Sequence, residues 1–170
     1  HDVPDTIAAL LTRGEVVARC TGRLEFGARA LGNRSILADP SRWDVVRVIN
    51  DMIKSRDFWM PFAPSILSTE AHRFIRNPKG LRSPYMILAF DSTQEAAALQ
   101  AAMHPYDRTI RPQIVERSWN PEYYDIIEQE VGVSGKAGNL QGRIDPAGNV
   151  FEGPRQREYP MPPLRGAGFT

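Results

Sequence analysis

Cationic side chains concentrate in residues 23–56, where seven Lys or Arg residues face four acidic ones. Three of the arginines lie in GRLEFGARALGNRSIL, and its three glycines free the backbone to bend. Guanidinium groups and backbone N–H donors can then converge on one anion. The stretch therefore predicts a phosphate-binding loop.

Two common nucleotide signatures are absent, since the chain contains neither GxxxxGK[ST] nor GxGxxG. The alternative is that the arginines are solvated surface charges paired with nearby carboxylates. For any single arginine the two interpretations carry equal weight. Arg42 and Arg47, on the helix expected after Ser41, fit the solvated class better.

Lys54 and Arg56 stand two residues apart at the expected end of that helix. In an extended segment such residues point the same way, which would direct an ammonium and a guanidinium into one pocket. The pair is suited to a polyphosphate and to charge developing on it. Two exposed charges at a helix end are the alternative.

Both helical and strand periodicities occur along the chain. An α/β or α+β domain on one twisted mixed sheet follows from their order. The expected helices are a run from Pro4 to Gly14, one capped by Ser41 and ending near Lys54, residues 69–75, and one capped by Asn120. The expected strands are 16–20, 61–67, 85–90 and 110–115, the last pushed to a sheet edge by Pro112.

Length and charge restrict the function further. The 170 residues suffice for one core, and 21 basic against 20 acidic residues give a net charge of +1. This balance argues against a protein that coats nucleic acids through an overall positive charge. The chain shows no membrane span or signal peptide, which predicts a cytoplasmic protein. Cys20, the single cysteine, is expected to be a buried structural thiol.

Glycine and proline mark a boundary near residue 131. Residues 132–170 contain 8 Gly and 5 Pro, against 5 Gly and 9 Pro in the preceding 131 residues. Branched aliphatic residues are too widely spaced there for their burial to offset the conformational entropy that ordering the segment would cost. We therefore expect a domain at 1–131 and a divergent, poorly ordered tail at 132–170.

The motifs carry a resemblance. GRLEFGARALGNRSILADP, followed by KSRDFWMPFAPSIL, resembles the C-terminal domain of the carbamoyltransferases of the nodulation and antibiotic-tailoring type. The later segments SPYMILAF, HPYDRTIRPQIV and NPEYYDIIEQ match that family in order and spacing. The resemblance covers residues 6–131.

The resemblance implies a fold similar to that of the threonylcarbamoyl-adenylate synthases. Such a domain binds carbamoyl phosphate and ATP with Mg²⁺, with no tightly bound cofactor and no protein metal site. It forms a carbamoyl-adenylate that an N-terminal ASKHA-type domain, absent here, passes to a hydroxyl acceptor. Because converging cations and Mg²⁺ stabilise the reacting anions, no protein nucleophile is required.

The resemblance also assigns roles to individual residues. Lys54 and Arg56 match the family's Lys-x-Arg pair on the phosphates, and His104 matches a histidine suited to orienting a carbamoyl oxygen or carrying a proton. A structural turn histidine is equally compatible with His104. The residues matched to substrate contacts are Arg34 with Ser35, Arg111, and, with less support, Arg29 and Asn33.

One departure from the family concerns the end of the domain. Relatives continue after the last helix with an apolar strand and an Asn-Thr-Ser-Phe-Asn segment, whereas this chain reads GVSGKAGNLQGRIDPAGN. We therefore expect a sheet that is incomplete at its C-terminal end, in a truncated chain whose own activity is in doubt. An RNA-binding module of related fold, and a remnant or subunit of a split carbamoyltransferase, are the alternatives.

Overall fold

The protein is an α+β domain, as the periodicities predict, and its structure is a computed structural model that describes residues 2–27, 29–49, 61–134 and 139–143. Five strands form one sheet in the order β1-β2-β5-β3-β4. Only β3 and β4 pair in parallel; every other neighbouring pair is antiparallel. The strands are β1 (Val17–Cys20), β2 (Arg34–Ala38), β3 (Ala63–Leu67), β4 (Gln113–Val115) and β5 (Asn139–Arg143).

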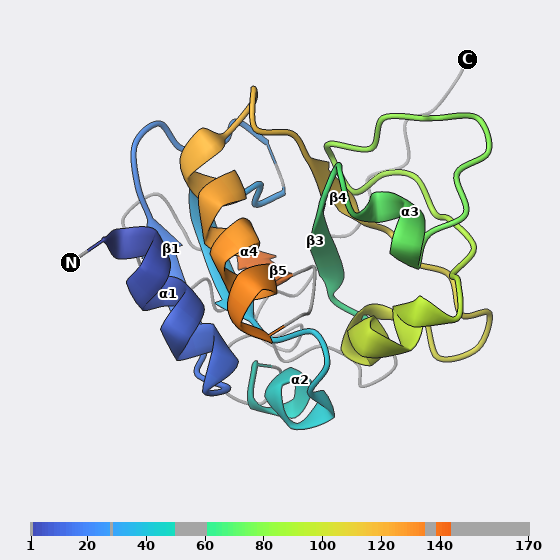
Figure 1. The fold of residues 1–170 in the computed structure, drawn as a ribbon, viewed down its shortest axis with the longest axis horizontal. Helices are drawn as coiled ribbons and strands as arrows, with labels where there is room; N and C mark the ends of the chain where they lie inside the picture. The colour runs from blue at the N-terminus through green and yellow to red at the C-terminus, as the bar shows by residue number, and fades with distance from the viewer. Residues whose placement is uncertain (1, 28, 50–60, 135–138, 144–170) are drawn as a thin grey trace, which may run out of the picture.

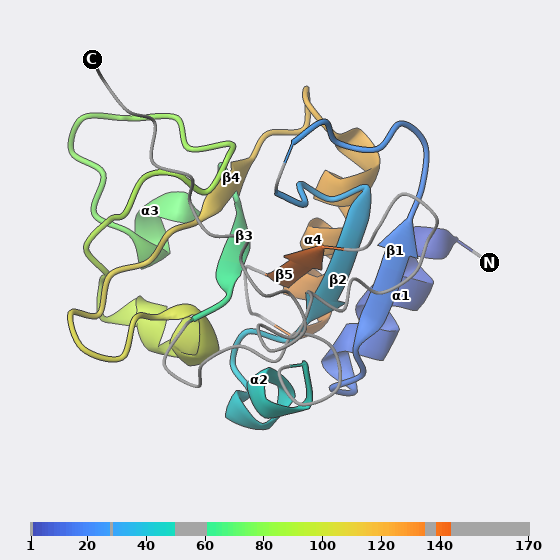
Figure 2. The ribbon, with the colours of Figure 1, turned by 180° about the vertical axis from the view of Figure 1, so that it is seen from behind.

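Helices cover the sheet. Two of them, α1 (Val3–Thr12) and α4 (Pro121–Ser134), pack side by side on the same face, in front of β1 and β2 in Figure 1 and behind them in Figure 2. Shorter elements complete the domain: α2 (Trp43–Ile49), α3 (Ala71–Phe74) and the 3-10 helix η2 (Glu95–Ala102).

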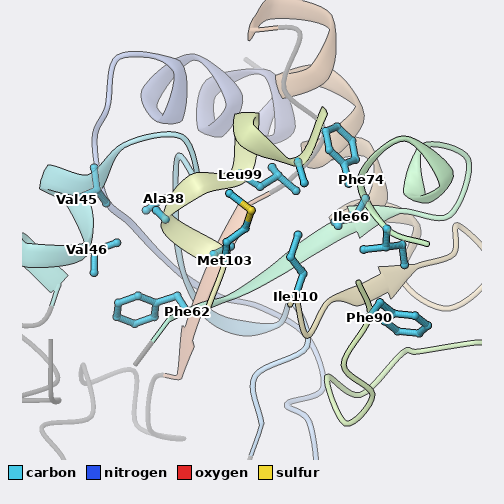
Figure 3. Close-up of a cluster of buried hydrophobic side chains, with 14 of the residues drawn as sticks. Ala38, Val45, Val46, Phe62, Ile66, Phe74, Phe90, Leu99, Met103 and Ile110 are labelled. Atoms are coloured by element: carbon cyan, nitrogen blue, oxygen red, sulfur yellow. The ribbon is translucent and has the colours of Figure 1, made fainter. Parts of the chain in front are cut away.

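The central strands β2 and β3 are buried on both faces. Neighbouring residues of a strand point in opposite directions, so each of these strands contributes to two clusters. In β2, Leu37 packs under α1 and α4, whereas Ile36 and Ala38 face a second cluster. Figure 3 shows members of that second cluster, in which Phe62, Leu99, Met103 and Ile110 surround the strands. The residues packed around Leu37 include Ile7, Leu11, Tyr123, Ile126 and Ile127.

The cap predicted for the last helix is confirmed. Asn120 accepts a hydrogen bond at its Oδ1 from the Tyr123 N–H, 3.1 Å away, and Pro121 occupies the first turn. The predicted edge position of the strand after Pro112 is also confirmed, since β4 is the last strand of the sheet. Edge strands tolerate a proline because one side of their backbone needs no partner strand.

Residues 85–90 do not form the predicted strand. The backbone turns at Met86, whose φ of 57° lies in the left-handed region and breaks an extended pleat. Only Phe90 pairs, in an isolated bridge with Ile110. Apolar composition alone therefore gave the wrong element here.

Cys20 is exposed, so the prediction of a buried thiol was wrong. Strand alternation explains the difference. In β1 the inward position falls on Arg19, which is 5% exposed, and its neighbour Cys20 must face outward.

A fifth strand occupies the position that the sequence analysis expected to be missing. The β5 strand pairs with β2 through Ser35–Arg143 and with β3 through Ser65–Asn139. It lies between those strands, so the expectation that the sheet lacks a strand at its C-terminal end was wrong. The similarity to the synthase fold stays a prediction, as does the division of the chain at residue 131.

Gly32 is required where the loop before β2 meets α4. Its φ is +123°, and a Cβ at this position would lie 2.5 Å from the Tyr123 ring. Gly27 has nearly the same φ, +122°, with open space around it. Substitution by alanine would thus strain the backbone similarly at both glycines, and only at Gly32 would the new Cβ also clash with the Tyr123 ring.

We predict that Gly32→Ala lowers the free energy of unfolding by at least about 3 kcal/mol, because strain and overpacking add. Gly27→Ala, the matched control, should cost about 1 kcal/mol from the backbone conformation alone. Urea denaturation followed by circular dichroism measures both values. Equal losses in the two variants would contradict the proposed contact with Tyr123.

Candidate functional site

The predicted phosphate-binding loop is organised by the carboxylate of Glu25. One oxygen, Oε1, accepts hydrogen bonds from the N–H groups of Leu31 at 2.8 Å and Asn33 at 2.6 Å. The other, Oε2, lies 3.3 Å from Nε of Arg34. Both charged side chains are more than nine-tenths buried. Glu25 therefore fixes the path of the chain between the glycines and β2.

Arg34 is a framework residue in this arrangement. Besides its ion pair with Glu25, its guanidinium donates a hydrogen bond to the carbonyl of Gly27, and its side chain is 4% exposed. Its charge is compensated locally, so an anion at the loop would meet little of it. The role of Arg34 as a substrate contact stays a prediction.

Ser35 does not share a face with Arg34, because the two are consecutive in β2. Ser35 is fully buried and accepts a hydrogen bond at its Oγ from the Gly32 N–H at 3.0 Å. Its register partner is Arg19 of β1, which lies under α4. The structure thus does not direct the side chains of Arg34 and Ser35 toward one ligand.

Asn33 connects the loop to α4. Its Oδ1 accepts hydrogen bonds from Arg19 at 3.3 Å and from Nδ2 of Asn120 at 2.8 Å, while its own Nδ2 donates to the Arg23 carbonyl at 2.7 Å. Arg19 also pairs with Glu122 at 2.9 Å. These bonds hold the loop against the first turn of α4.

Arg29 and Arg111 are exposed, as a contact to a soluble anion requires. No hydrogen bond or ion pair joins either of them to Arg34 or His104 in the part of the chain that the structure describes. Lys54 and Arg56 lie outside the described residues. Convergence of the predicted cations on one cavity is therefore untested.

His104 lies in a hydrogen-bonded turn. Its Nδ1 is 3.1 Å from Oδ1 of Asp107, and its backbone N–H donates to the Thr109 carbonyl at 2.9 Å. The backbone N–H and hydroxyl of Thr109 are the main cause of a lowered pKa at Asp107, with the nearby imidazole contributing less. A carboxylate with a lowered pKa stabilises the fold above its unfolded-state pKa, and that contribution disappears as the pH falls through the folded-state pKa.

Arg42 is an exposed residue paired with Asp44, which confirms the prediction that it is a solvated charge. Arg47 is also exposed. The side-chain hydrogen bond from Arg42 is the main cause of a lowered pKa at Asp44. Neither residue contributes to the loop around Glu25.

Sequence patterns did not reveal Glu25 and Arg19 as organising residues. Glu25 counted only toward charge balance, and Arg19 stood unnoticed inside an apolar strand. A single acidic residue inside a motif rich in arginine and glycine is the signal that would have found Glu25. Arg19 gives no such signal, because its partners are 13 residues or more away along the chain.

Among the described residues, no group of three metal-ligating side chains comes together. None of the described helices has the length and apolar character needed to cross a membrane.

Comparison with known proteins gives a consistent set of matches. Residues 8–137 match the family described as Carbamoyltransferase C-terminus. The chain is 39% identical over 127 residues to nodulation protein NolO of Bradyrhizobium diazoefficiens, covering 74% of this chain and 23% of NolO.

Two other relatives extend the comparison. Over 123 residues the chain is 35% identical to the 3'-hydroxymethylcephem-O-carbamoyltransferase of Amycolatopsis lactamdurans, covering 72% of this chain and 23% of the relative. It is 38% identical over 147 residues to an uncharacterized protein of Methanocaldococcus jannaschii, covering 82% and 24%. The chain thus spans about a quarter of the length of these relatives.

We predict that Glu25→Ala lowers the free energy of unfolding by about 3 kcal/mol, because it leaves the buried guanidinium of Arg34 and two amide groups without their partner. Thermal and urea denaturation measure the loss. Asp44→Asn serves as the control, since it breaks a solvent-exposed pair and should leave the melting temperature nearly unchanged. A Glu25→Ala protein as stable as the control would show that Glu25 does not organise the loop.

Proposed function

Because the chain belongs to the family of carbamoyltransferase C-terminal domains, we propose that it binds carbamoyl phosphate and ATP and joins them into a carbamoyl-adenylate. The family itself, and with it the class of transferase, rests on the match over residues 8–137. The relative from Amycolatopsis lactamdurans is named as an O-carbamoyltransferase, which supports carbamoyl transfer as the reaction that the proposed carbamoyl-adenylate serves.

The chemistry of the proposed reaction requires cations and a loop with a fixed conformation that binds anions. Water first cleaves the phosphoryl group from carbamoyl phosphate, which gives carbamate and inorganic phosphate. A carbamate oxygen then forms a bond to the α-phosphorus of ATP while pyrophosphate leaves, so anions must approach one another. Mg²⁺ enters as part of the ATP complex and neutralises phosphate charge. The residues proposed to supply the protein's share are Lys54, Arg56, Arg29 and Arg111, with His104 near a carbamoyl oxygen.

The observation that carries the proposal is the loop fixed by Glu25 within the matched region. Its backbone is held by the hydrogen bonds of Leu31 and Asn33, while Arg23 and Arg29 remain exposed on it. A loop fixed before its ligand arrives loses less conformational freedom on binding. The Glu25–Arg34 pair thus supports anion binding indirectly, by fixing the loop.

The exposed cations elsewhere do not favour the RNA-binding alternative. Arg42, Arg73, Arg82 and Arg117 each pair with a carboxylate. The pairing of these four arginines weakens the continuous positive field that a polyanion requires. A small phosphorylated metabolite fits this charge distribution better.

The acceptor and the transfer step are assigned to another part of the enzyme. Because the relatives are about four times as long as the matched segment, we propose that an N-terminal ASKHA-type domain receives the carbamoyl-adenylate. That domain belongs either to the same chain or to a separate subunit. The identity of the hydroxyl acceptor would depend on it.

Isothermal titration with carbamoyl phosphate tests the proposal. We predict that replacing Lys54 and Arg56 together by alanine weakens binding at least tenfold, because each charge-assisted contact contributes about 1.5 kcal/mol or more. The double variant Arg42→Ala/Arg47→Ala removes the same charge from two exposed positions, one just before α2 and one on it, and is the matched control. Equal affinities in the two double variants would refute the proposed phosphate site.

A further inference from the structure

A buried amide joins the edge strand β4 to the loop between β1 and β2, which we call the Glu25 loop. Gln113, the first residue of β4, is only 6% exposed. Its Nε2 donates a hydrogen bond to the carbonyl of Leu31 at 3.0 Å, across 82 residues of sequence. Its Oε1 accepts a hydrogen bond from the hydroxyl of Ser65 in β3, also at 3.0 Å. The side chain of Gln113 therefore connects the loop to two strands of the sheet.

The neighbours of this amide determine which of its ends faces which partner. A carbonyl only accepts hydrogen bonds, so the NH₂ group must face Leu31, and the Ser65 hydroxyl can donate to the remaining oxygen. An ionised carboxylate in place of the amide would offer no donor, and a lysine would offer no acceptor. The amide of Gln113 is thus suited to both neighbours at once.

Leu31 is held at both polar groups of its backbone. Its N–H donates to Oε1 of Glu25 at 2.8 Å, and its carbonyl accepts from Gln113. The bond to Glu25 lies within the loop, because the two residues are six apart in the chain. Asn33 fixes the loop to the cap of α4, whereas the bond to Gln113 fixes it to the last strand of the sheet.

The backbone on both sides of Arg111 is fixed as well. Ile110 and Phe90 exchange two backbone hydrogen bonds, at 2.9 and 3.0 Å. The carbonyl of Pro112 accepts a hydrogen bond at 3.0 Å from Oγ of Ser83, which is 3% exposed. Arg111 therefore extends from a fixed backbone, while its own side chain is exposed.

Two exposed arginines lie close to the hydrogen bond between Leu31 and Gln113. Arg29 precedes Leu31 by two residues, and Arg111 precedes Gln113 by two residues. Two residues of backbone span at most about 7 Å, so both arginines start near this bond. Guanidinium groups on neighbouring backbones can hold one anion between them. Because one arginine belongs to the loop and the other to the sheet, their separation depends on the bond that joins the two.

We propose that Gln113 is a positioning residue of the anion site, whose amide holds the loop so that Arg29 and Arg111 reach the same anionic group. This inference rests on the proposed function, in which both arginines contact phosphorylated substrates. In this role Gln113 touches no ligand. It acts through the Leu31 carbonyl, and thereby on the backbone from which Arg29 extends.

The test compares Gln113→Met with Ser65→Ala. Gln113→Met keeps a side chain of similar volume and removes the amide, whereas Ser65→Ala removes a hydrogen bond from the same buried pair and retains the bond to Leu31. Isothermal titration of the full chain with carbamoyl phosphate should show binding about tenfold weaker in Gln113→Met, because an arginine that loses its position loses a charge-assisted contact. Ser65→Ala should bind like the unmodified protein.

A second measurement needs no ligand. Hydrogen–deuterium exchange at the amides of Leu31 and Asn33 should be faster in Gln113→Met and unchanged in Ser65→Ala, because only the first variant frees the loop from β4. Melting curves compare the global stability of the two variants. A merely structural role would lower both melting temperatures without a difference in loop exchange or in affinity.

The double variant Ser65→Ala/Gln113→Met keeps the test decisive if Gln113→Met does not fold. It replaces both members of the buried pair by apolar side chains, which is better tolerated than the loss of one partner. Its loop exchange and its affinity for carbamoyl phosphate should match those expected of Gln113→Met, and Ser65→Ala remains its control.

Equal loop exchange, or equal affinity for carbamoyl phosphate, in the Gln113 variants and in Ser65→Ala would overturn the inference. If binding depends on Lys54 and Arg56 but not on Gln113, the inference fails and the proposed function stands. If the unmodified protein does not bind carbamoyl phosphate, the proposed function fails. In that case the exchange measurement alone decides whether Gln113 positions the loop.

Discussion

The arrangement of the candidate site depends on one buried carboxylate. Among the described residues between β1 and β2 there is no helix or strand. The shape of this loop therefore comes from Glu25, which accepts hydrogen bonds from two backbone N–H groups and pairs with Arg34. Burying the two charges is costly, and the amide hydrogen bonds offset part of that cost. The pair is retained because it specifies a conformation that backbone pairing does not supply.

This constraint extends from the loop to the helix that packs on the sheet. Asn33 receives hydrogen bonds from Arg19 and from the cap residue Asn120, and Arg19 also pairs with Glu122 in the first turn of α4. The apolar contacts of α4 with α1 and β2 therefore hold in place the polar groups that shape the loop. The arrangement of the candidate site is thus a tertiary property, since Arg19 belongs to β1, Glu25 and Asn33 to the loop, and Asn120 to the cap of α4.

Sequence periodicity correctly predicted the elements that bury one face. The predictions were wrong where contacts with residues distant in the sequence determine the local structure. The first and last helices and the edge position of β4 follow from apolar spacing, caps and Pro112. The segment around Met86 is apolar but turns, and alternation in β1 buries Arg19 and exposes Cys20. Within the candidate site, the arginine-rich loop was recognisable. The role of Glu25 was not, because its partners are backbone amides six and eight residues away.

Asn33 links the Glu25 loop to the helix that packs on the sheet. Its backbone N–H donates to Glu25, whereas its side-chain Oδ1 accepts a hydrogen bond from Asn120, the cap residue of α4. Because one residue makes both contacts, a shift of the loop would disturb the start of α4, and a movement of α4 would disturb the loop. The conformation of the loop is therefore coupled to the packing of α4 on the sheet.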